Sequence, residues 1–477
     1  MEQYGKMVED MRAVFKSGKT KTRDWRVSQL NAVIRFLTEK QREICEALKL
    51  DLLKDGYDSI VDEVAFCIDE AKWFLSNLNR LMKDKKLVNI GSTAYVHCEP
   101  LGVILDIGAW NYPIQIPIST MINIIAAGNC IVIKPSELAE NTSKLLANLL
   151  PNYMDPLKWD HVIYTGSGPV GKIVYKAAAE HLTPCTLELG GKCPSYVDAG
   201  SDLDSVCNRI CWAKFKNAGQ TCISVDYIME AFIQKLCDTI KEQYTDNPAQ
   251  CDSYCQIIND RHFQRVSDLL DSSPGANIRL GGVSDRTARY FSPTVVTGVG
   301  PSDRMMQEEI FGPLLPVFAV RDHKEAIDFI NGREKALHVN VFSKDKAVID
   351  EFVQRTSSGG VSANDCIIFR IERGLPFGGV GASGFGCYGG DSGFENFSHR
   401  KSVLVKPQGM EFLNKMMRYS PHTPEKMKRL QFIFKLPERL NTLLKGLAVF
   451  VPAAVIIGVV LYFGITKGIP DSKTGHL

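Results

Sequence analysis

The residue best suited to chemistry is one of the cysteines. Cys222 closes the run NAGQTC at residues 217–222, directly after a Gly-Gln turn. A thiolate is an effective nucleophile near neutral pH, so this side chain can attack a carbonyl carbon. Taken alone, a single cysteine is more often a buried and unreactive thiol. Both interpretations stay open on this segment by itself.

A second candidate is Glu188, which lies in the run LELGGK at residues 187–192. Apolar neighbours raise the pKa of a carboxyl group, and such a group can act as a general base. The alternative is an exposed carboxylate at a helix end, against which Leu187 and Leu189 argue. Three further segments complete the set of candidates: WNYP at 110–113, EEIFGP at 308–313 and PFGGVG at 376–381.

A glycine-rich turn adds a possible cofactor site. It matches the GxGxxG pattern, follows an apolar run at 161–165 and precedes a helical pattern at 170–181, which is the context of a dinucleotide fingerprint. The pattern alone is weak, because a tight strand-to-helix turn would look the same. One of its residues is a proline, which removes an amide from the turn. The six residues are Gly166, Ser167, Gly168, Pro169, Val170 and Gly171.

The elements that must position these residues alternate between strands and helices. Helical periodicity covers 8–50 and 58–86. Alternation of this kind predicts an α/β fold with a parallel sheet, and a second α/β stretch begins near residue 186. Ser136 is the expected N-cap of the helix at 137–150. The predicted strands are 103–107, 130–134 and 161–165, and each is followed by a predicted helix, at 117–127, 137–150 and 170–181.

Composition narrows the class of protein. The chain has 477 residues, 45% of them hydrophobic and 23% charged, which predicts a folded protein of two or three domains. A net charge of +2 argues against nucleic acid as a partner. The 14 cysteines are scattered, as in a reducing compartment. Neither CxxxC pair, Cys207 with Cys211 or Cys251 with Cys255, has the spacing of a zinc site, so we expect no metal.

The C-terminal region is different in kind. Residues 446–466 carry no charge, and at about 1.5 Å per residue they can cross a bilayer core of about 30 Å. A buried core helix is the alternative. The basic residues that precede this stretch place the large N-terminal body in the cytosol by the positive-inside rule. The sequence therefore predicts a tail-anchored protein.

Taken in order along the chain, these segments and the run KPSE at 134–137 resemble the aldehyde dehydrogenase superfamily. The resemblance extends to about residue 405. The run GQTCISVDYI at 219–228 and the apolar C-terminal stretch are similar to the class 3 branch, that of the fatty aldehyde dehydrogenases. This resemblance implies an aldehyde dehydrogenase fold in which a small β-flap joins the two subunits of a homodimer. The expected parts are N-terminal helices and a Rossmann-like NAD domain at 1–185, an α/β catalytic domain at 186–385, the flap at 386–410, a basic segment at 411–445 and a transmembrane helix at 446–466.

The resemblance also implies roles for single residues. Cys222 would be the nucleophile, and Glu188 the general base for hydrolysis. The Asn111 side chain and the Cys222 backbone N–H would stabilise the oxyanion. Residues 166–171 would face the pyrophosphate of NAD, Lys134 and Glu137 would hold the adenosine ribose, Glu309 would bind the nicotinamide ribose, and Phe311 would pack near it or belong to the core.

One departure from the family pattern concerns the NAD domain. The helix after KPSE reaches the strand at 161 almost directly, through residues 150–161. The family has another strand and helix at this point, so a strand-helix unit is absent. Losing it would expose apolar faces of the sheet.

The sequence thus predicts NAD-dependent oxidation of medium- to long-chain aldehydes through a cysteine thioester, by a protein anchored in the endoplasmic reticulum membrane. A free carboxylate at Glu137 favours NAD over NADP, because it repels the 2′-phosphate. The alternative is a membrane-tethered variant with no or weak activity and impaired NAD binding. An esterase that uses Cys222 without NAD is a third hypothesis.

Overall fold

The computed structural model describes residues 12–87, 92–154, 161–229, 232–409 and 411–434. The chain divides into two compact units. The first comprises Met1–Met82 and Pro100–His399, and the second comprises Lys83–Glu99 and Arg400–Leu477. Both predicted α/β stretches lie in the first unit.

The first sheet of this unit contains all three strands predicted from the apolar runs. Four of its strands are parallel, and the short fifth strand is antiparallel to its neighbour. The fifth strand comes from far along the chain, which the sequence did not predict. The strand order is β16 (Gly384–Phe385), β6 (Cys185–Leu189), β5 (His161–Gly166), β3 (Val103–Ile107) and β4 (Cys130–Lys134).

The two faces of this sheet are covered unequally. The crossovers through α6 (Gln115–Ala127) and α8 (Gly168–Ala179) run in opposite directions from its centre, which places the two helices on opposite faces. On the α6 face, Ile104 and Asp106 are fully buried. On the α8 face, Leu105 is in register with Val132 and Val162, and all three are only half-buried. The α8 face is therefore covered where Tyr164, Leu187 and Leu189 pack together and less covered around Leu105.

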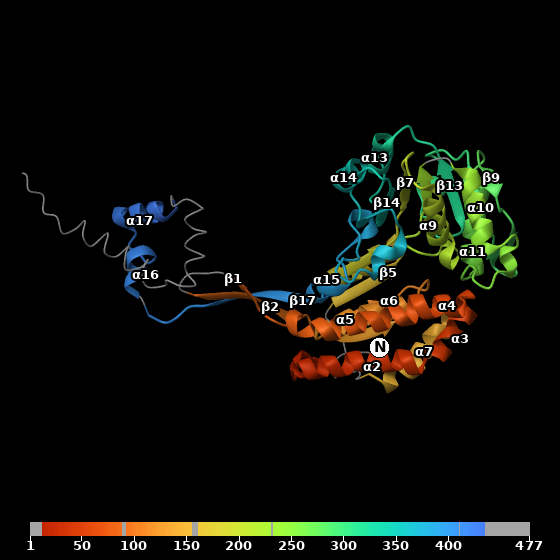
Figure 1. The fold of residues 1–477 in the computed structure, drawn as a ribbon. Helices are drawn as coiled ribbons and strands as arrows, with labels where there is room; N and C mark the ends of the chain where they lie inside the picture. Colours follow the sequence, from red (N-terminus) through yellow and green to blue (C-terminus); the bar gives the residue numbers. More distant parts are fainter. Residues whose placement is uncertain (1–11, 88–91, 155–160, 230–231, 410, 435–477) are drawn as a thin grey trace, which may run out of the picture. The chain divides into compact units, whose positions relative to one another are not determined.

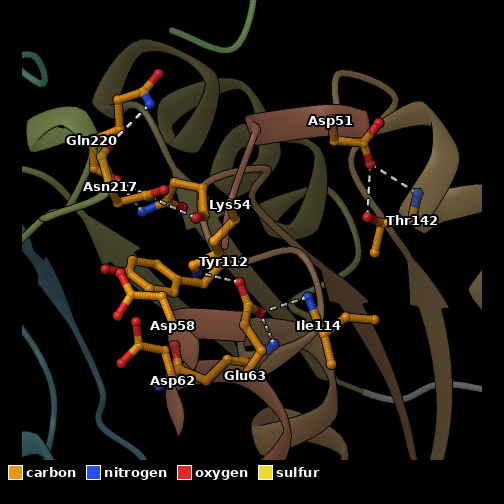
Figure 2. Close-up of polar contacts among 12 residues, drawn as sticks. Asp51, Lys54, Asp58, Asp62, Glu63, Tyr112, Ile114, Thr142, Asn217 and Gln220 are labelled. Atoms are coloured by element: carbon orange, nitrogen blue, oxygen red, sulfur yellow. Dashed lines mark hydrogen bonds and ion pairs between the residues drawn. The ribbon is translucent and has the colours of Figure 1, made fainter. Parts of the chain in front are cut away.

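Helix α7 (Glu140–Leu149) begins three residues later than expected, and its N-terminus is not capped by Ser136. The Asp51 carboxylate of α3 takes this role (Figure 2). Its oxygens accept the Asn141 backbone N–H at 3.0 Å and the Thr142 backbone N–H at 2.8 Å. The cap prediction was wrong because a residue distant in sequence supplies the acceptor.

The second sheet forms the larger core of the unit. Its strands are parallel except for the last, which is antiparallel to its neighbour. The order is β15 (Gly360–Ala363), β14 (His338–Phe342), β7 (Pro194–Val197), β8 (Tyr227–Met229), β13 (Leu314–Phe318), β12 (Thr294–Thr297) and β9 (Asn277–Leu280). Helices of this part are α9 (Leu203–Phe215), α10 (Ile233–Tyr244), α11 (Asp260–Asp271), α12 (Arg304–Gln307), α13 (His323–Asn331) and α14 (Lys346–Arg355).

The N-terminal region is helical, as its periodicity predicts, but broken into more pieces. Helices α2 and α5 pack against each other and against α6, and Figure 1 shows the three running side by side. The helices are α2 (Arg23–Glu39), α3 (Gln41–Leu52), α4 (Gly56–Asp58), a π-helical turn η2 (Ser59–Ala65) and α5 (Phe66–Leu81).

Buried ion pairs join this helical region to the two loops that carry candidate site residues. Lys54 and Glu63 are fully buried, and their Nζ and Oε1 atoms lie 2.7 Å apart. The other Glu63 oxygen accepts the backbone N–H of Ile114 at 3.0 Å (Figure 2). Lys54 Nζ also lies 4.1 Å from the centre of the Tyr112 ring. The loop between β3 and α6 is thereby fixed to the N-terminal helices.

A second set of ion pairs reaches the turn before Cys222. Lys216 is almost buried, and its Nζ lies 2.7 Å from an Asp58 oxygen and 2.9 Å from an Asp62 oxygen. Lys216 opens the turn η4 (Lys216–Gly219). Asp58 and Asp62 belong to the same short segment as Glu63, so one stretch of chain holds both loops.

The second unit contains a three-stranded sheet in the order β1 (Lys85–Leu87), β2 (Thr93–Pro100) and β17 (Ser398–Val405). It also holds helices α16 (Glu411–Met417) and α17 (Pro424–Phe434). Among the helices of the described residues, none is both long and apolar enough to cross a bilayer. The span predicted at 446–466 lies outside the described residues. The first unit also contains some short elements. They are β10 (Ser284–Asp285), β11 (Tyr290–Phe291), α15 (Gly390–Asn396) and the turns η1 (Lys19–Lys21), η3 (Leu150–Asn152), η5 (Pro248–Gln250), η6 (Ile367–Ile371) and η7 (Gly381–Ser383).

Candidate active site

Glu188 lies within strand β6, between β5 and β16. Its side chain is 3% exposed, and neither carboxyl oxygen has a hydrogen-bond partner among the described residues. Burial raises its pKa well above the ordinary value, while the positive charge of Arg370 opposes this shift. A buried carboxyl group with a raised pKa and no hydrogen-bond partner among the described residues is a candidate general base.

The turn before Cys222 has an unusual backbone. Asn217, Ala218 and Gly219 have φ values of 54°, 52° and 73°, so three successive residues are left-handed. A Cβ atom at Gly219 would lie 2.3 Å from the carbonyl oxygen of Gly312, so this position requires glycine. The Gln220 amide donates to the carbonyl oxygens of Asn217 and Gln256, both at 3.0 Å. These bonds fix a conformation that would otherwise be costly.

The Cys222 side chain is half-buried. Burial, followed by the charges of Glu309 and Glu188, raises its pKa to about 12, and the charge of Arg370 acts in the opposite direction. The resting residue is therefore a thiol near neutral pH. The Cys193 thiol donates a hydrogen bond to the Cys222 carbonyl oxygen, with a distance of 3.4 Å from sulfur to oxygen.

Asn111 lies beside this turn. Its Nδ2 donates to the Gln220 carbonyl oxygen at 3.1 Å, which uses one of its two N–H groups and leaves the other for an oxyanion. Asn217 donates to the Asn111 carbonyl oxygen at 2.8 Å, and Figure 2 shows Asn217 and Gln220 near each other above Tyr112. The Tyr112 and Thr221 hydroxyls share a hydrogen bond of 2.9 Å. The structure thus brings the two predicted loops together.

The glycine-rich turn leads into α8, whose N-cap, Ser167, makes no side-chain capping bond. The first amides of the helix are thereby available to an anion, apart from the missing N–H of Pro169. A Cβ atom at Gly166 would lie 2.4 Å from the Tyr164 hydroxyl, and one at Gly171 would lie 2.8 Å from Leu189. The turn packs this closely only with glycine at both positions. Gly168 and Val170 lie in the first turn of α8. This arrangement of turn and helix suits a pyrophosphate group.

Lys134 and Glu137 lie at the end of β4 and in the loop that follows. Their charged groups form an ion pair, and both side chains are exposed. In α/β sheets the ends of the strands on this side are where ligands bind. The pair can therefore contact a ribose hydroxyl group near the turn at 166–171.

Glu309 lies at the wall of a cavity of 820 Å³ that is also lined by Gly190, Gly191 and Lys192. Its Oε1 has no hydrogen-bond partner among the described residues. Burial and the charge of Asp226 raise its pKa to about 8. A Cβ atom at Gly190 would lie 2.0 Å from a Glu309 oxygen, so the glycine pair makes room for this carboxyl group. A group with hydroxyls, such as a ribose, would satisfy the free oxygen.

The backbone around Glu309 is held by two residues that sequence reasoning missed. Arg265 donates to the carbonyl oxygens of Glu309 and Phe311, both at 3.2 Å. Asp226 accepts the Ile310 backbone N–H at 3.0 Å. The Phe311 ring lies 5.3 Å from that of Trp110 in an edge-to-face arrangement. Phe311 therefore contacts the residue before Asn111.

Sequence reasoning also missed the ion pairs that hold these loops and the position of Arg370. Arg370 follows no recognised motif. Lys54 lies in the loop between α3 and α4 and Glu63 in the turn η2, and charged residues at such positions are ordinarily solvated. The sequence feature that could have indicated these ion pairs is the high density of acidic residues at 55–63.

Comparisons with known proteins agree with this arrangement. The family model described as "Aldehyde dehydrogenase family" matches residues 1–156 and 153–403. Aldehyde dehydrogenase family 3 member A2 of Rattus norvegicus is 42% identical, over 94% of this chain and 99% of the relative. A relative of Mus musculus, "Aldehyde dehydrogenase, dimeric NADP-preferring", is 45% identical over 90% of this chain and its own full length. A structure of Staphylococcus aureus AldH in a substrate-bound state has a TM-score of 0.85 at 34% identity and covers 91% of this chain and 99% of its own. The chain belongs to the aldehyde dehydrogenase family.

Proposed function

We propose that this aldehyde dehydrogenase oxidises medium- to long-chain aliphatic aldehydes to carboxylic acids, with NAD as the cofactor. The observation that carries the proposal is the hydrogen bond from Asn111 to the turn before Cys222, together with the buried carboxyl group of Glu188. The chain-length preference rests on the resemblance to the fatty aldehyde dehydrogenases and on the apolar segment at 446–466.

The roles of the chain's residues follow from these positions. The Cys222 thiol gives its proton to water, its sulfur forms a bond to the carbonyl carbon of the aldehyde, and the carbonyl electron pair moves to oxygen. The second N–H of Asn111 Nδ2 and the Cys222 backbone N–H donate to this oxyanion. NAD, when bound, supplies the hydride acceptor. For release of the acid, Glu188 takes a proton from water, whose oxygen attacks the thioester carbon while the Cys222 sulfur leaves.

The residues present suit a nicotinamide dinucleotide. The open amides of α8 would hold the pyrophosphate, Lys134 and Glu137 the adenosine ribose, and Glu309 the nicotinamide ribose, with Phe311 beside it. The Glu137 carboxylate would repel the 2′-phosphate of NADP, which favours NAD. The mouse relative is named NADP-preferring, and the ion pair between Lys134 and Glu137 weakens the repulsion, so the preference for NAD is a moderate one.

We further propose that the NAD domain lacks one strand-helix unit and binds the dinucleotide weakly. In the described part of the chain, β4 pairs with β3 alone. On the α8 face of the sheet Leu105, Val132 and Val162 are half-buried, and on α8 itself Val170 and Ile173 are 44% and 66% exposed. The family model matches in two stretches that meet at 153–156, where the unit would be absent. A weakly active variant is therefore the second candidate function.

The C-terminal segment at 446–466 would anchor the chain in the endoplasmic reticulum membrane with its catalytic body in the cytosol. The three strands β1, β2 and β17 would join two copies as a homodimer. Both proposals rest on the sequence and the family resemblance, together with the word "dimeric" in the name of the mouse relative.

Replacing Cys222 by serine should reduce NADH formation with aldehydes below detection, because a serine hydroxyl is a much weaker acid and a weaker nucleophile than a thiol. Glu188→Gln should lower steady-state turnover by about 10²- to 10⁴-fold and leave the acyl group on Cys222, since the general base acts on the thioester. Cys251→Ser is the matched control. Wild-type NADH formation by the Cys222→Ser protein would show that another residue is the nucleophile. Hydrolysis of a nitrophenyl ester without any NADH formation by the wild type would support an esterase instead.

Inserting the strand-helix segment of the rat relative between Asp155 and Lys158 should tighten NAD binding and raise the melting temperature. Covering a few hundred Å² of apolar surface contributes several kcal/mol at about 25 cal/mol per Å². Calorimetric titration with NAD would measure the affinity, with a glycine-serine insertion of equal length as the control. Equal micromolar affinity of the native and extended chains would mean that the fold has closed over the gap.

Ending the chain before Gly446 should release it from membranes and leave its turnover of water-soluble aldehydes unchanged, because every proposed site residue precedes this point. Fractionation of tagged full-length and shortened chains would measure the release. The proposal fails if the full-length chain stays in the supernatant without detergent.

A further inference from the structure

Arg370 carries a positive charge near the candidate active site and has no anionic partner in the described part of the chain. Its guanidinium carbon lies 4.4 Å from the ring centre of Phe377, 4.8 Å from that of Phe66 and 5.0 Å from that of Tyr388. Aromatic faces stabilise a cation, but a guanidinium group also has five N–H donors. Within the described residues, none of these donors makes a hydrogen bond or an ion pair.

Its neighbour Arg373 has polar partners, although Arg373 Nη1 has none among the described residues. Arg373 also lies over the Phe66 ring, at 4.1 Å. In addition it donates to Asp69 at 3.1 Å and to the Phe66 carbonyl oxygen at 2.9 Å. Arg373 has the partners expected of a structural role, and Arg370 lacks them.

The position of Arg370 is fixed by the turn η6. Within this turn the Phe369 ring stacks on His338, with ring centres 3.9 Å apart and an angle of 8° between the planes. His338 is buried and shares a hydrogen bond of 2.7 Å with Ser362. Phe377, under the guanidinium group, is also buried. The arginine is therefore held in place before any ligand binds, which lowers the entropic cost of binding.

Arg370 lies within electrostatic reach of the reacting groups. The Tyr388 ring, over which its guanidinium group lies, comes four residues after Gly384, which pairs with Glu188. The positive charge of Arg370 opposes the rise in pKa that burial causes at Glu188 and Cys222. Glu188 is not its counter-ion, because neither Glu188 oxygen has a hydrogen-bond partner among the described residues. The group that enters this region and contacts Cys222 is the aldehyde substrate.

We propose that Arg370 binds a carboxylate at the far end of the aldehyde substrate, so that the preferred substrates are aliphatic ω-oxo carboxylates. The planar fork of a guanidinium group matches a carboxylate with two parallel hydrogen bonds. The proposal rests on the proposed function, because it takes Cys222 as the point where the aldehyde reacts.

The test compares matched pairs of substrates with the full-length chain in detergent. The pairs are 4-oxobutanoate with butanal and 9-oxononanoate with nonanal. The wild type should favour the oxo acid of at least one pair in kcat/KM. Arg370→Gln should lower the ratio of kcat/KM, oxo acid over alkanal, by about 10- to 100-fold, the loss of one charge-assisted pair. Arg370→Lys should restore part of the ratio, and Arg373→Gln should leave it unchanged.

A binding measurement separates this proposal from the proposed function. Succinate, a dicarboxylate, should protect Cys222 from iodoacetamide in the wild type and the Arg373→Gln protein, but not in the Arg370→Gln protein, as read by peptide mass spectrometry. An unchanged substrate ratio and equal protection in all three proteins would overturn the proposal. So would an equal loss on oxo acids and alkanals together with a shift of Cys222 alkylation to higher pH, which would make Arg370 a group that acts on the thiol. Absence of NADH formation with every aldehyde would defeat the proposed function, while the protection result would still decide the role of Arg370.

Discussion

The buried ion pair between Lys54 and Glu63 is the interaction on which the rest of the site depends. Two charges without solvent are costly unless each is paired and hydrogen-bonded. Glu63 meets this condition by accepting backbone N–H groups at the start of α6 as well as the Lys54 ammonium group. The same short segment binds Lys216 through Asp58 and Asp62. The loop of Asn111 and the turn of Cys222 can therefore hold their conformations only together with the N-terminal helices.

Local patterns in the sequence predicted the elements whose formation depends on residues close together in the chain. The strands at 103–107, 130–134 and 161–165 follow from apolar runs between turns, and the α/β class follows from their alternation with helices. The residue positions around Cys222 and Glu188 follow from short motifs. The ion pairs could not be predicted in this way, because Glu63 and Ile114 are 51 residues apart and Asp58 and Lys216 are 158 apart. The wrong cap at Ser136 has the same origin, since Asp51 acts on α7 from 91 residues away.

The contacts that cover the α8 face of the first sheet differ from those that hold the reacting groups. Leu105, Val132 and Val162 are half-buried on the α8 face, where the adenosine end of a dinucleotide would bind. Asn111 and Cys222 are held by the N-terminal helices and by the segment around Gln256. A shortened NAD domain should therefore weaken cofactor binding and leave the nucleophile and the oxyanion donors in place. Arg370 belongs to the second group of contacts, because it is fixed by η6 and the aromatic rings.

The dependence of the site on the ion pair between Lys54 and Glu63 is tested most directly in the Lys54→Met protein. The measurements are urea unfolding and the rate at which iodoacetamide modifies Cys222. Removing one partner of a buried pair should lower the free energy of unfolding by about 3–5 kcal/mol, and the loosened turn should expose Cys222 to faster alkylation. Lys346→Met, which removes an exposed partner of Asp350, should change the free energy of unfolding by no more than about 1 kcal/mol. If the Lys54→Met protein matched this control in both stability and alkylation rate, the ion pair would not be what holds the site.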